Sequence, residues 1–192
     1  EEMEHDACGV GVIVSTEGKK SRTIVEYGIE ALKAVWHRGA VDADGKTGDG
    51  AGIHLEIPKD FFIEKIEVTG HEHDNSEICV GMIFLPRNDY SAQETCKTIV
   101  ESELTKNNFS IYGWRQVPVN PKILGEKAFQ TMPEIMQVLF KSNDKNLLDK
   151  NLERKIYETR KKIENKAFQL SLNNFYICSI SSKSIIYKGL YL

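Results

Sequence analysis

Cysteine is scarce in this sequence of 192 residues, which contains only Cys8, Cys79, Cys96 and Cys178. None of the four stands in the CxxC or CxxxC spacing of a zinc site, and their scatter argues against a dense disulfide framework. The sequence therefore predicts no metal site in this chain. Reduced thiols are the expected state, and they favour a cytoplasmic location.

The chain also lacks a long hydrophobic run and an excess of positive charge. No apolar stretch approaches the ~20 residues of a membrane span, and no apolar segment of the signal-peptide type follows a basic start. The formal net charge of −3 provides no basic surface for nucleic acid or for an anionic membrane. We therefore expect neither a nucleic acid nor a membrane among the partners.

The composition fits one globular domain. Hydrophobic residues make up 41% of the chain and charged residues 28%, which is ordinary for a soluble protein. A chain of this length can bury a substantial core. No internal repeat, low-complexity tract or linker divides it, so a single domain is expected.

The spacing of apolar residues predicts strands and helices in alternation. Predicted strands cover residues 7–15, 51–57, 78–85, 109–117, 175–181 and 184–190, the last two as a hairpin. Predicted helices begin at Ser21, at a capping box formed by Ser91 and Glu94, and near Leu147. The near-continuous apolar run 78–85 is typical of a strand covered on both faces. The pattern indicates a mixed α and β layered fold.

The polar segment His71-Glu72-His73 admits two interpretations. Imidazole and carboxylate groups are metal ligands, so the segment could contribute to a metal site. It lies in a probable connection between strands, however, and the sequence offers no third ligand cluster beside it. A solvated loop is therefore the favoured interpretation.

Cys8 begins the run Cys8-Gly9-Val10-Gly11. A thiol is mostly protonated near neutrality and needs a base beside it to act as a nucleophile. The α-amine of an N-terminal cysteine, with an unperturbed pKa of about 7.7 to 8.0, can be that base without a histidine. Residues 1–7 precede Cys8, so its amine must first be released. Taken alone, the same pattern is also that of an ordinary buried thiol.

Two more motifs follow Cys8 in order, His37-Arg38-Gly39-Ala40 and Thr47-Gly48-Asp49-Gly50-Ala51-Gly52. The ordered set resembles the glutaminase domain of glutamate synthase large subunits, which is a class II glutamine amidotransferase. The resemblance extends over nearly the whole chain, through Ile57-Pro58, Phe61-Phe62, 113–119, Leu124-Gly125, 133–138, 175–179 and 187–190.

The resemblance implies an α+β fold, the αββα layered sandwich of N-terminal nucleophile hydrolases, of which this chain holds the N-terminal half. It also implies a reaction. The cysteine thiolate attacks the side-chain amide carbon of glutamine, ammonia leaves for glutamate synthesis, and water hydrolyses the thioester. Cys8 matches the nucleophile, residues 1–7 match a propeptide-like leader, and 8–192 form the partial domain.

Further roles follow from the same resemblance. Arg38 and Gly39 match the motif that binds glutamine, and a guanidinium suits a carboxylate. From the residues alone, Arg38 could instead complement a helix dipole and Gly39 could be a helix cap. His37 is expected to pack or cap. The segment Thr47, Gly48, Asp49 and Gly50 is expected to support the site loop, with Asp49 bonding backbone amides.

The second half of the family domain is absent from the sequence. It carries a segment beginning Arg-Phe-Ser-Thr-Asn-Thr and a later His-Asn-Gly-Glu, which supply a second arginine and the oxyanion hole. Losing one oxyanion donor costs about 10² to 10³ in rate, so the chain is expected to be inactive alone. FMN and the iron–sulfur cluster belong to other domains, and no cofactor is expected here.

Two hypotheses remain at this point. In the first, the chain is part of an enzyme whose partners are glutamine, the missing half of the domain and the remaining synthase domains. In the second, it is a non-catalytic remnant or a partner-binding half-domain that lacks the oxyanion hole. Both predict an exposed apolar seam, because half of a layered sandwich leaves core surface uncovered.

Overall fold

The computed structural model describes residues 9–35, 43–48 and 50–190. The chain divides into two compact units. Unit 1 consists of the residues up to Ile53, the segment Asn120–Thr131 and the residues from Lys188 onward. Unit 2 consists of His54–Val119 and Met132–Tyr187.

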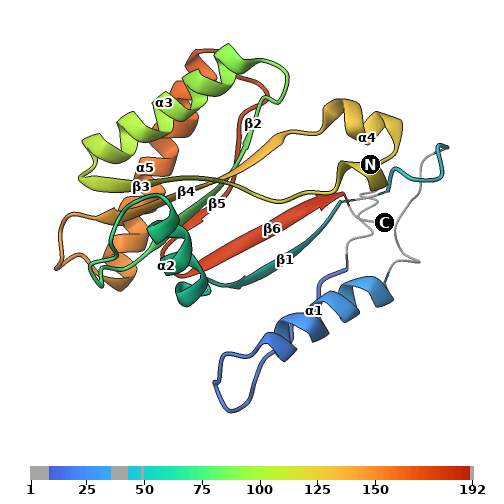
Figure 1. Ribbon diagram of the computed structural model, residues 1–192, viewed down its shortest axis with the longest axis horizontal. Helices are drawn as coiled ribbons and strands as arrows, with labels where there is room; N and C mark the ends of the chain where they lie inside the picture. Colours follow the sequence, from blue (N-terminus) through green and yellow to red (C-terminus); the bar gives the residue numbers. More distant parts are fainter. Residues whose placement is uncertain (1–8, 36–42, 49, 191–192) are drawn as a thin grey trace, which may run out of the picture. The chain divides into compact units, whose positions relative to one another are not determined.

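Unit 2 is built on an antiparallel four-stranded sheet (Figure 1). The strand order is β3-β4-β2-β5. The strands are β2 (Cys79–Leu85), β3 (Phe109–Gln116), β4 (Glu134–Ser142) and β5 (Tyr176–Ser181). The central position of β2 explains its apolar sequence, because a strand with a neighbour on each side and a covered sheet on both faces has no wet surface.

Side chains of β2 alternate between two hydrophobic clusters. Cys79 and Ile83 belong to the first cluster, and Val80 and Met82 belong to the second. Between them lies Gly81, where an added Cβ would lie 2.7 Å from a methyl carbon of Val138. The predicted strand over 78–85, covered on both faces, is confirmed.

Helices α3 (Tyr90–Lys106) and α5 (Asp149–Gln169) cover one face of this sheet side by side (Figure 1). Each helix buries an apolar stripe in the first cluster: Cys96, Ile99, Val100 and Leu104 from α3, and Leu152, Ile156 and Ile163 from α5. The opposite side of α5 carries charged residues. The amphipathic helix predicted near 147–167 is thus confirmed.

The predicted start of α3 is wrong by two residues. Asp89 is the N-cap, and its Oδ1 accepts a hydrogen bond from the amide of Ala92 at 2.9 Å. Ser91 lies inside the first turn, where its carbonyl accepts from Thr95 Oγ1 at 2.8 Å. Aspartate and serine are both good N-caps, so the Ser91–Glu94 spacing pointed to the wrong one of two neighbouring candidates.

The other face of the sheet packs on α2 (Lys59–Val68) and on side chains of β1 (Gly50–Glu56) and β6 (Ser184–Leu190). β1 and β6 pair with each other in a two-stranded sheet. The largest side chains of this second cluster include Ile57, Phe62, Ile66, Leu139 and Ile185. Sheet faces covered by helices on one side and by a second strand layer on the other are the layered α+β arrangement that was predicted.

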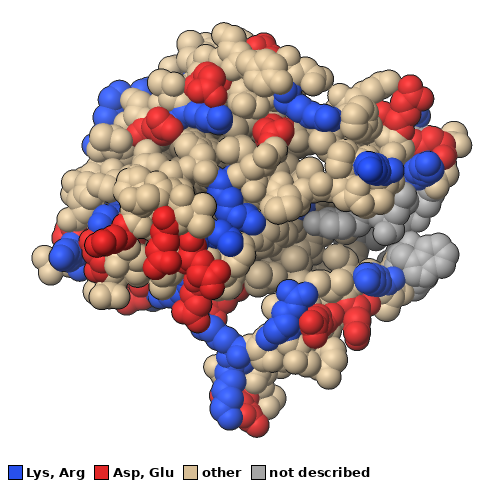
Figure 2. All heavy atoms as spheres, viewed as in Figure 1, with Lys and Arg blue, Asp and Glu red and all other residues tan. Residues whose placement is uncertain are grey.

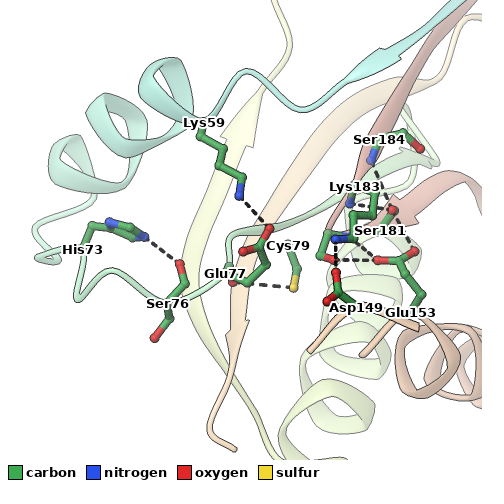
Figure 3. A network of polar contacts seen from close by, with 11 residues as sticks. Lys59, His73, Ser76, Glu77, Cys79, Asp149, Glu153, Ser181, Lys183 and Ser184 are labelled. Atoms are coloured by element: carbon green, nitrogen blue, oxygen red, sulfur yellow. Dashed lines mark hydrogen bonds and ion pairs between the residues drawn. The ribbon is translucent and has the colours of Figure 1, made fainter. Parts of the chain in front are cut away.

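The predicted hairpin of the last two strands is wrong. β5 pairs with β2, whereas β6 pairs with β1 in the other sheet. The corner between them is held by Glu153 of α5, which accepts from Ser181 Oγ at 2.9 Å and from Ser182 N and Oγ, each at 2.7 Å (Figure 3). The hydrogen bonds to α5 thus stabilise the corner at which the chain passes from the four-stranded sheet to the two-stranded one.

Unit 1 contains α1 (Arg22–Ala34), which begins where predicted. Ser21 is its N-cap, with Oγ accepting from the amide of Thr23 at 3.2 Å. No residue of α1 is buried. The strand predicted over 7–15 is not formed in its described part, where Val10 is 94% and Val12 82% exposed. Among the strands of the described residues, none pairs with this apolar segment.

Unit 1 also contains two short helices, the 3₁₀ turn η2 (Pro121–Ile123) and α4 (Glu126–Thr131). Of the helices in the described residues, none combines the length and the apolarity that a membrane crossing requires. Lysine and arginine side chains are interspersed with acidic ones on the face that Figure 2 shows.

Candidate functional site

The carboxylate of Asp44 accepts several hydrogen bonds in the loop that leads into β1. Asp44 Oδ1 accepts hydrogen bonds from the amides of Lys46 at 2.9 Å and Thr47 at 2.7 Å. Its Oδ2 accepts from the Thr47 hydroxyl at 2.5 Å. An aspartate that bonds amides two and three residues ahead forms a compact Asx turn. Gly45, at φ +67°, occupies the left-handed position of this turn.

These bonds stabilise the charged form of Asp44. The hydroxyl and then the amide of Thr47, with the amide of Lys46, lower its pKa from 3.8 to about 2. The positive charge of Lys127 acts in the same direction. Asp44 is therefore a carboxylate at every pH at which the protein would work, although it is exposed to solvent.

A second segment of unit 1 packs against this turn. At Gly125, an added Cβ would overlap the carboxylate of Asp44 and the hydroxyl of Thr47. Gly125 comes directly before α4, in the segment Asn120–Thr131 that connects β3 to β4. Only a residue without a side chain leaves space for the turn at this point.

Some of the predicted site residues are described by the structure and others are not. Thr47 and Gly48 are half-buried, and Gly50 begins β1. Cys8, Arg38, Gly39 and Asp49 lie outside the described residues, as does His37. The structure thus brings Thr47 together with Asp44 and Gly125. The roles of all the predicted site residues stay predictions.

Asp44 and Gly125 were missed as site residues. Asp44 had a signal, because aspartate followed by glycine is typical of a turn in which the carboxylate bonds the backbone. Gly125 appeared only in the motif Leu124-Gly125 of the resemblance. Its contact with Asp44 had no signal, because a close approach between segments about eighty residues apart leaves no local pattern.

The three described cysteines are poor candidates for a nucleophile. Cys79, Cys96 and Cys178 are buried free thiols. Burial raises the pKa of Cys79 well above its ordinary value and that of Cys96 to about 11. Since the thiolate is the reactive form, neither of these two groups is activated.

The histidine segment behaves as a loop. His71 is exposed, and His73 Nε2 lies 2.9 Å from the carbonyl of Ser76. Next to them, Asp74 pairs with Lys141 at 2.6 Å. Within the described ranges, no three His, Cys, Asp or Glu side chains gather as a metal site would require.

A separate polar group lies in the second cluster of unit 2. Arg115 Nη1 donates to Gln137 Oε1 at 2.7 Å, and Gln137 Nε2 donates to the Tyr187 hydroxyl at 3.2 Å. The Arg115 guanidinium also lies 5.2 Å from the centroid of the Phe61 ring. All four residues come from segments in the resemblance described above. Their contacts link α2, β3, β4 and β6.

Comparison of the sequence with known proteins identifies the family to which the chain belongs. The profile of the glutamine amidotransferases class-II matches residues 8–192. The chain is 54% identical over 191 residues to the NADPH glutamate synthase large chain of Azospirillum brasilense, covering 100% of this chain and 12% of that protein. It is 39% identical over 196 residues to a ferredoxin-dependent glutamate synthase of Pyropia yezoensis, covering 98% of this chain and 12% of that protein.

A ferredoxin-dependent glutamate synthase of Arabidopsis thaliana is 39% identical over 189 residues, covering 97% of this chain and 12% of that protein. The chain therefore spans about an eighth of the length of these relatives. The family match, by contrast, leaves out only residues 1–7. The chain belongs to the class II glutamine amidotransferases, whose domain has the N-terminal nucleophile hydrolase fold.

Proposed function

We propose that this chain is the N-terminal part of the glutaminase domain of a glutamate synthase, where it releases ammonia from glutamine for glutamate synthesis. The observation that carries the proposal is the family match, which begins at Cys8 and continues to the last residue. The three relatives named above are all glutamate synthases.

Cys8 is the proposed nucleophile, freed by removal of residues 1–7. The buried state of the other three thiols supports this assignment. The α-amine takes the thiol proton, and the thiolate attacks the side-chain amide carbon of glutamine. The amine then gives the proton to the leaving nitrogen, so ammonia departs and a thioester remains. The same amine activates a water molecule that releases glutamate and restores the thiol.

Arg38 and Gly39 are the proposed glutamine-binding residues. A guanidinium presents paired donors to the α-carboxylate of glutamine, and a glycine lets backbone approach the ligand. Thr47, Gly48, Asp49 and Gly50 are the proposed supports of the site. The ordered turn immediately before them is consistent with that role.

A further polypeptide segment is the proposed partner, namely the part of the class II domain that supplies the oxyanion donors. The exposed apolar segment of unit 1, at Val10, Val12 and Val14, supports this proposal. The small share of the Azospirillum brasilense relative that the chain covers, 12%, supports it as well. No cofactor is proposed for this chain, and the free thiols favour a cytoplasmic setting.

The test is ammonia release from glutamine by a chain that starts at Cys8, with Cys8→Ala as the control. It is measured alone and after addition of the remainder of the domain from the Azospirillum brasilense relative. We expect activity only in the combined sample, abolished by Cys8→Ala. No activity in either sample would favour the alternative of a non-catalytic remnant or partner-binding half-domain.

A further inference from the structure

We propose that Asp44 is a positioning residue for glutamine hydrolysis, and that it holds Thr47, the first residue of the proposed site segment, in place beside Gly125. This inference rests on the proposed function, because it names a residue that acts through the site loop of that reaction.

The first argument is the number of donors that Asp44 collects. Its two oxygens accept from two amides and one hydroxyl, all within residues 46–47. The carboxylate is thus committed to the backbone of its own loop, immediately before the proposed site segment begins at Thr47. A carboxylate that bonds several amides fixes a backbone that would otherwise sample many conformations.

The second argument is independent and comes from the segment Asn120–Thr131. By its contacts this segment belongs to unit 1, although the strands on either side of it, β3 and β4, belong to unit 2. Its Gly125 lies so close to Asp44 and Thr47 that a side chain there would displace them. The segment Asn120–Thr131, which connects the paired strands β3 and β4, therefore makes a specific contact with the turn at Asp44.

The consequence for catalysis concerns substrate binding. A glycine such as Gly48 loses more conformational freedom than other residues when a loop becomes ordered. A loop that is ordered beforehand binds its ligand more tightly, because less conformational entropy is lost on binding. Loss of the Asp44 contacts should therefore weaken glutamine binding while leaving the intrinsic reactivity of the Cys8 thiol unchanged.

The experiment uses the chain matured at Cys8 and combined with the remainder of the domain. Asp44→Ala, Thr47→Val and Gly125→Ala break the contact, whereas Thr47→Ser keeps the hydroxyl. One readout is tryptic cleavage after Lys46, followed by mass spectrometry. The other is alkylation of Cys8 by iodoacetamide at increasing glutamine concentrations.

We expect the three disruptive variants to be cleaved about tenfold faster after Lys46 and to need about tenfold more glutamine for half-protection of Cys8. Without glutamine, the alkylation rate should match that of the unsubstituted protein. Thr47→Ser should behave as the unsubstituted protein in both readouts. Asp44→Asn should be intermediate, because its side-chain oxygen still accepts from the two amides.

Gly81→Ala is the matched control, since it crowds the core of unit 2 and should lower stability without changing the half-protection concentration. Unchanged half-protection in Asp44→Ala, Thr47→Val and Gly125→Ala would overturn the inference and leave Asp44 a structural residue. Absence of glutamine protection in the unsubstituted protein would instead overturn the proposed function itself, and the inference with it.

Discussion

The carboxylate of Glu153 accepts hydrogen bonds from both the backbone amide and the hydroxyl of Ser182, each at 2.7 Å. Ser182 is only 1% exposed, so without Glu153 its two donors would lack a partner and would be shielded from water. Glu153 of α5 thus accepts the hydrogen bonds of the buried donors at the corner where the chain passes from the four-stranded sheet to the two-stranded one.

Glu153→Ala should destabilise the protein by about 2 kcal/mol, because buried donors that lose a charged acceptor are costly. Glu153→Gln should cost less, since its amide oxygen still accepts. Urea unfolding followed by circular dichroism measures both. Glu158→Gln, which removes an exposed ion-pair partner of Arg154, is the control and should change little. Equal stability of Glu153→Ala and the control would contradict the role of this corner.

The stability of the protein should fall at acid pH partly through Glu103. This side chain is 5% exposed and pairs with Lys166 and Lys106. The hydrogen bond from Lys166 is the main cause that lowers the pKa of Glu103 below 4.5. A carboxyl group with a lowered folded-state pKa stabilises the fold above its unfolded pKa, and this contribution is lost as the pH falls through the folded value.

Melting temperatures measured from neutral pH down to about pH 3 should therefore fall less steeply in Glu103→Gln than in the unsubstituted protein. Glu94→Gln serves as a surface control, because Glu94 is largely exposed. Parallel curves for all three proteins would contradict the assignment to Glu103.

Gly81→Ala should destabilise unit 2 by about 1 to 3 kcal/mol, the usual cost of overpacking a core. The new methyl group would lie 2.7 Å from Val138 Cγ1. Adding Val138→Ala removes that neighbour, so the double variant should lose less than the sum of the two single losses. Additive losses in urea unfolding would show that the crowding lies elsewhere.

Gln137→Leu should cost about 2 kcal/mol, because it removes the acceptor of Arg115 and the donor to Tyr187 from a fully buried position. Tyr187→Phe alone should cost about 1 kcal/mol. The two changes remove one shared hydrogen bond, so their effects on the free energy of unfolding should couple. A double-mutant cycle without coupling would contradict the bond.

Native thiol reactivity should distinguish the predicted nucleophile from the other cysteines. Because Cys79, Cys96 and Cys178 are buried, we expect a disulfide reagent such as Ellman's to modify them only slowly until urea is added. A single rapid reaction is expected from Cys8 and should disappear in Cys8→Ala. Persistence of the rapid phase in that variant would refute the assignment.

Elements with a strong local pattern could be predicted from the sequence. The continuous apolar run of β2 and the helical spacing in α5 each identified the correct element, because the burial that they reflect involves the element's own faces. The helix α2 was not predicted. It buries only Phe62 and Ile66, too few positions to stand out as a periodic stripe.

Long-range relationships could not be predicted in this way. The strands β5 and β6 are adjacent in sequence and read as a hairpin, yet their partners are β2 and β1. Likewise, the strand β4 was not predicted, and its Gln137 is buried because Arg115 and Tyr187 bond its amide. Nothing local in the sequence encodes those partners.

For the candidate site, the residues came from a resemblance rather than from a local rule. Chemistry alone gave Cys8 two interpretations, and only the order of motifs favoured one. The loop before Gly50 shows the reverse case. The turn at Asp44 could have been recognised from the Asp-Gly pair, whereas the contact of Asp44 with Gly125 required the structure.

The segment Asn120–Thr131 also determines how the molecule can be taken apart. The chain passes from unit 1 to unit 2 after Ile53, returns at Asn120, leaves again after Thr131 and returns once more at Lys188. No single peptide-bond cleavage can therefore release either unit, and neither can be expressed as one continuous fragment. A gene truncated at Asn120, Thr131 or Lys188 would encode residues of both units and leave at least one of them incomplete.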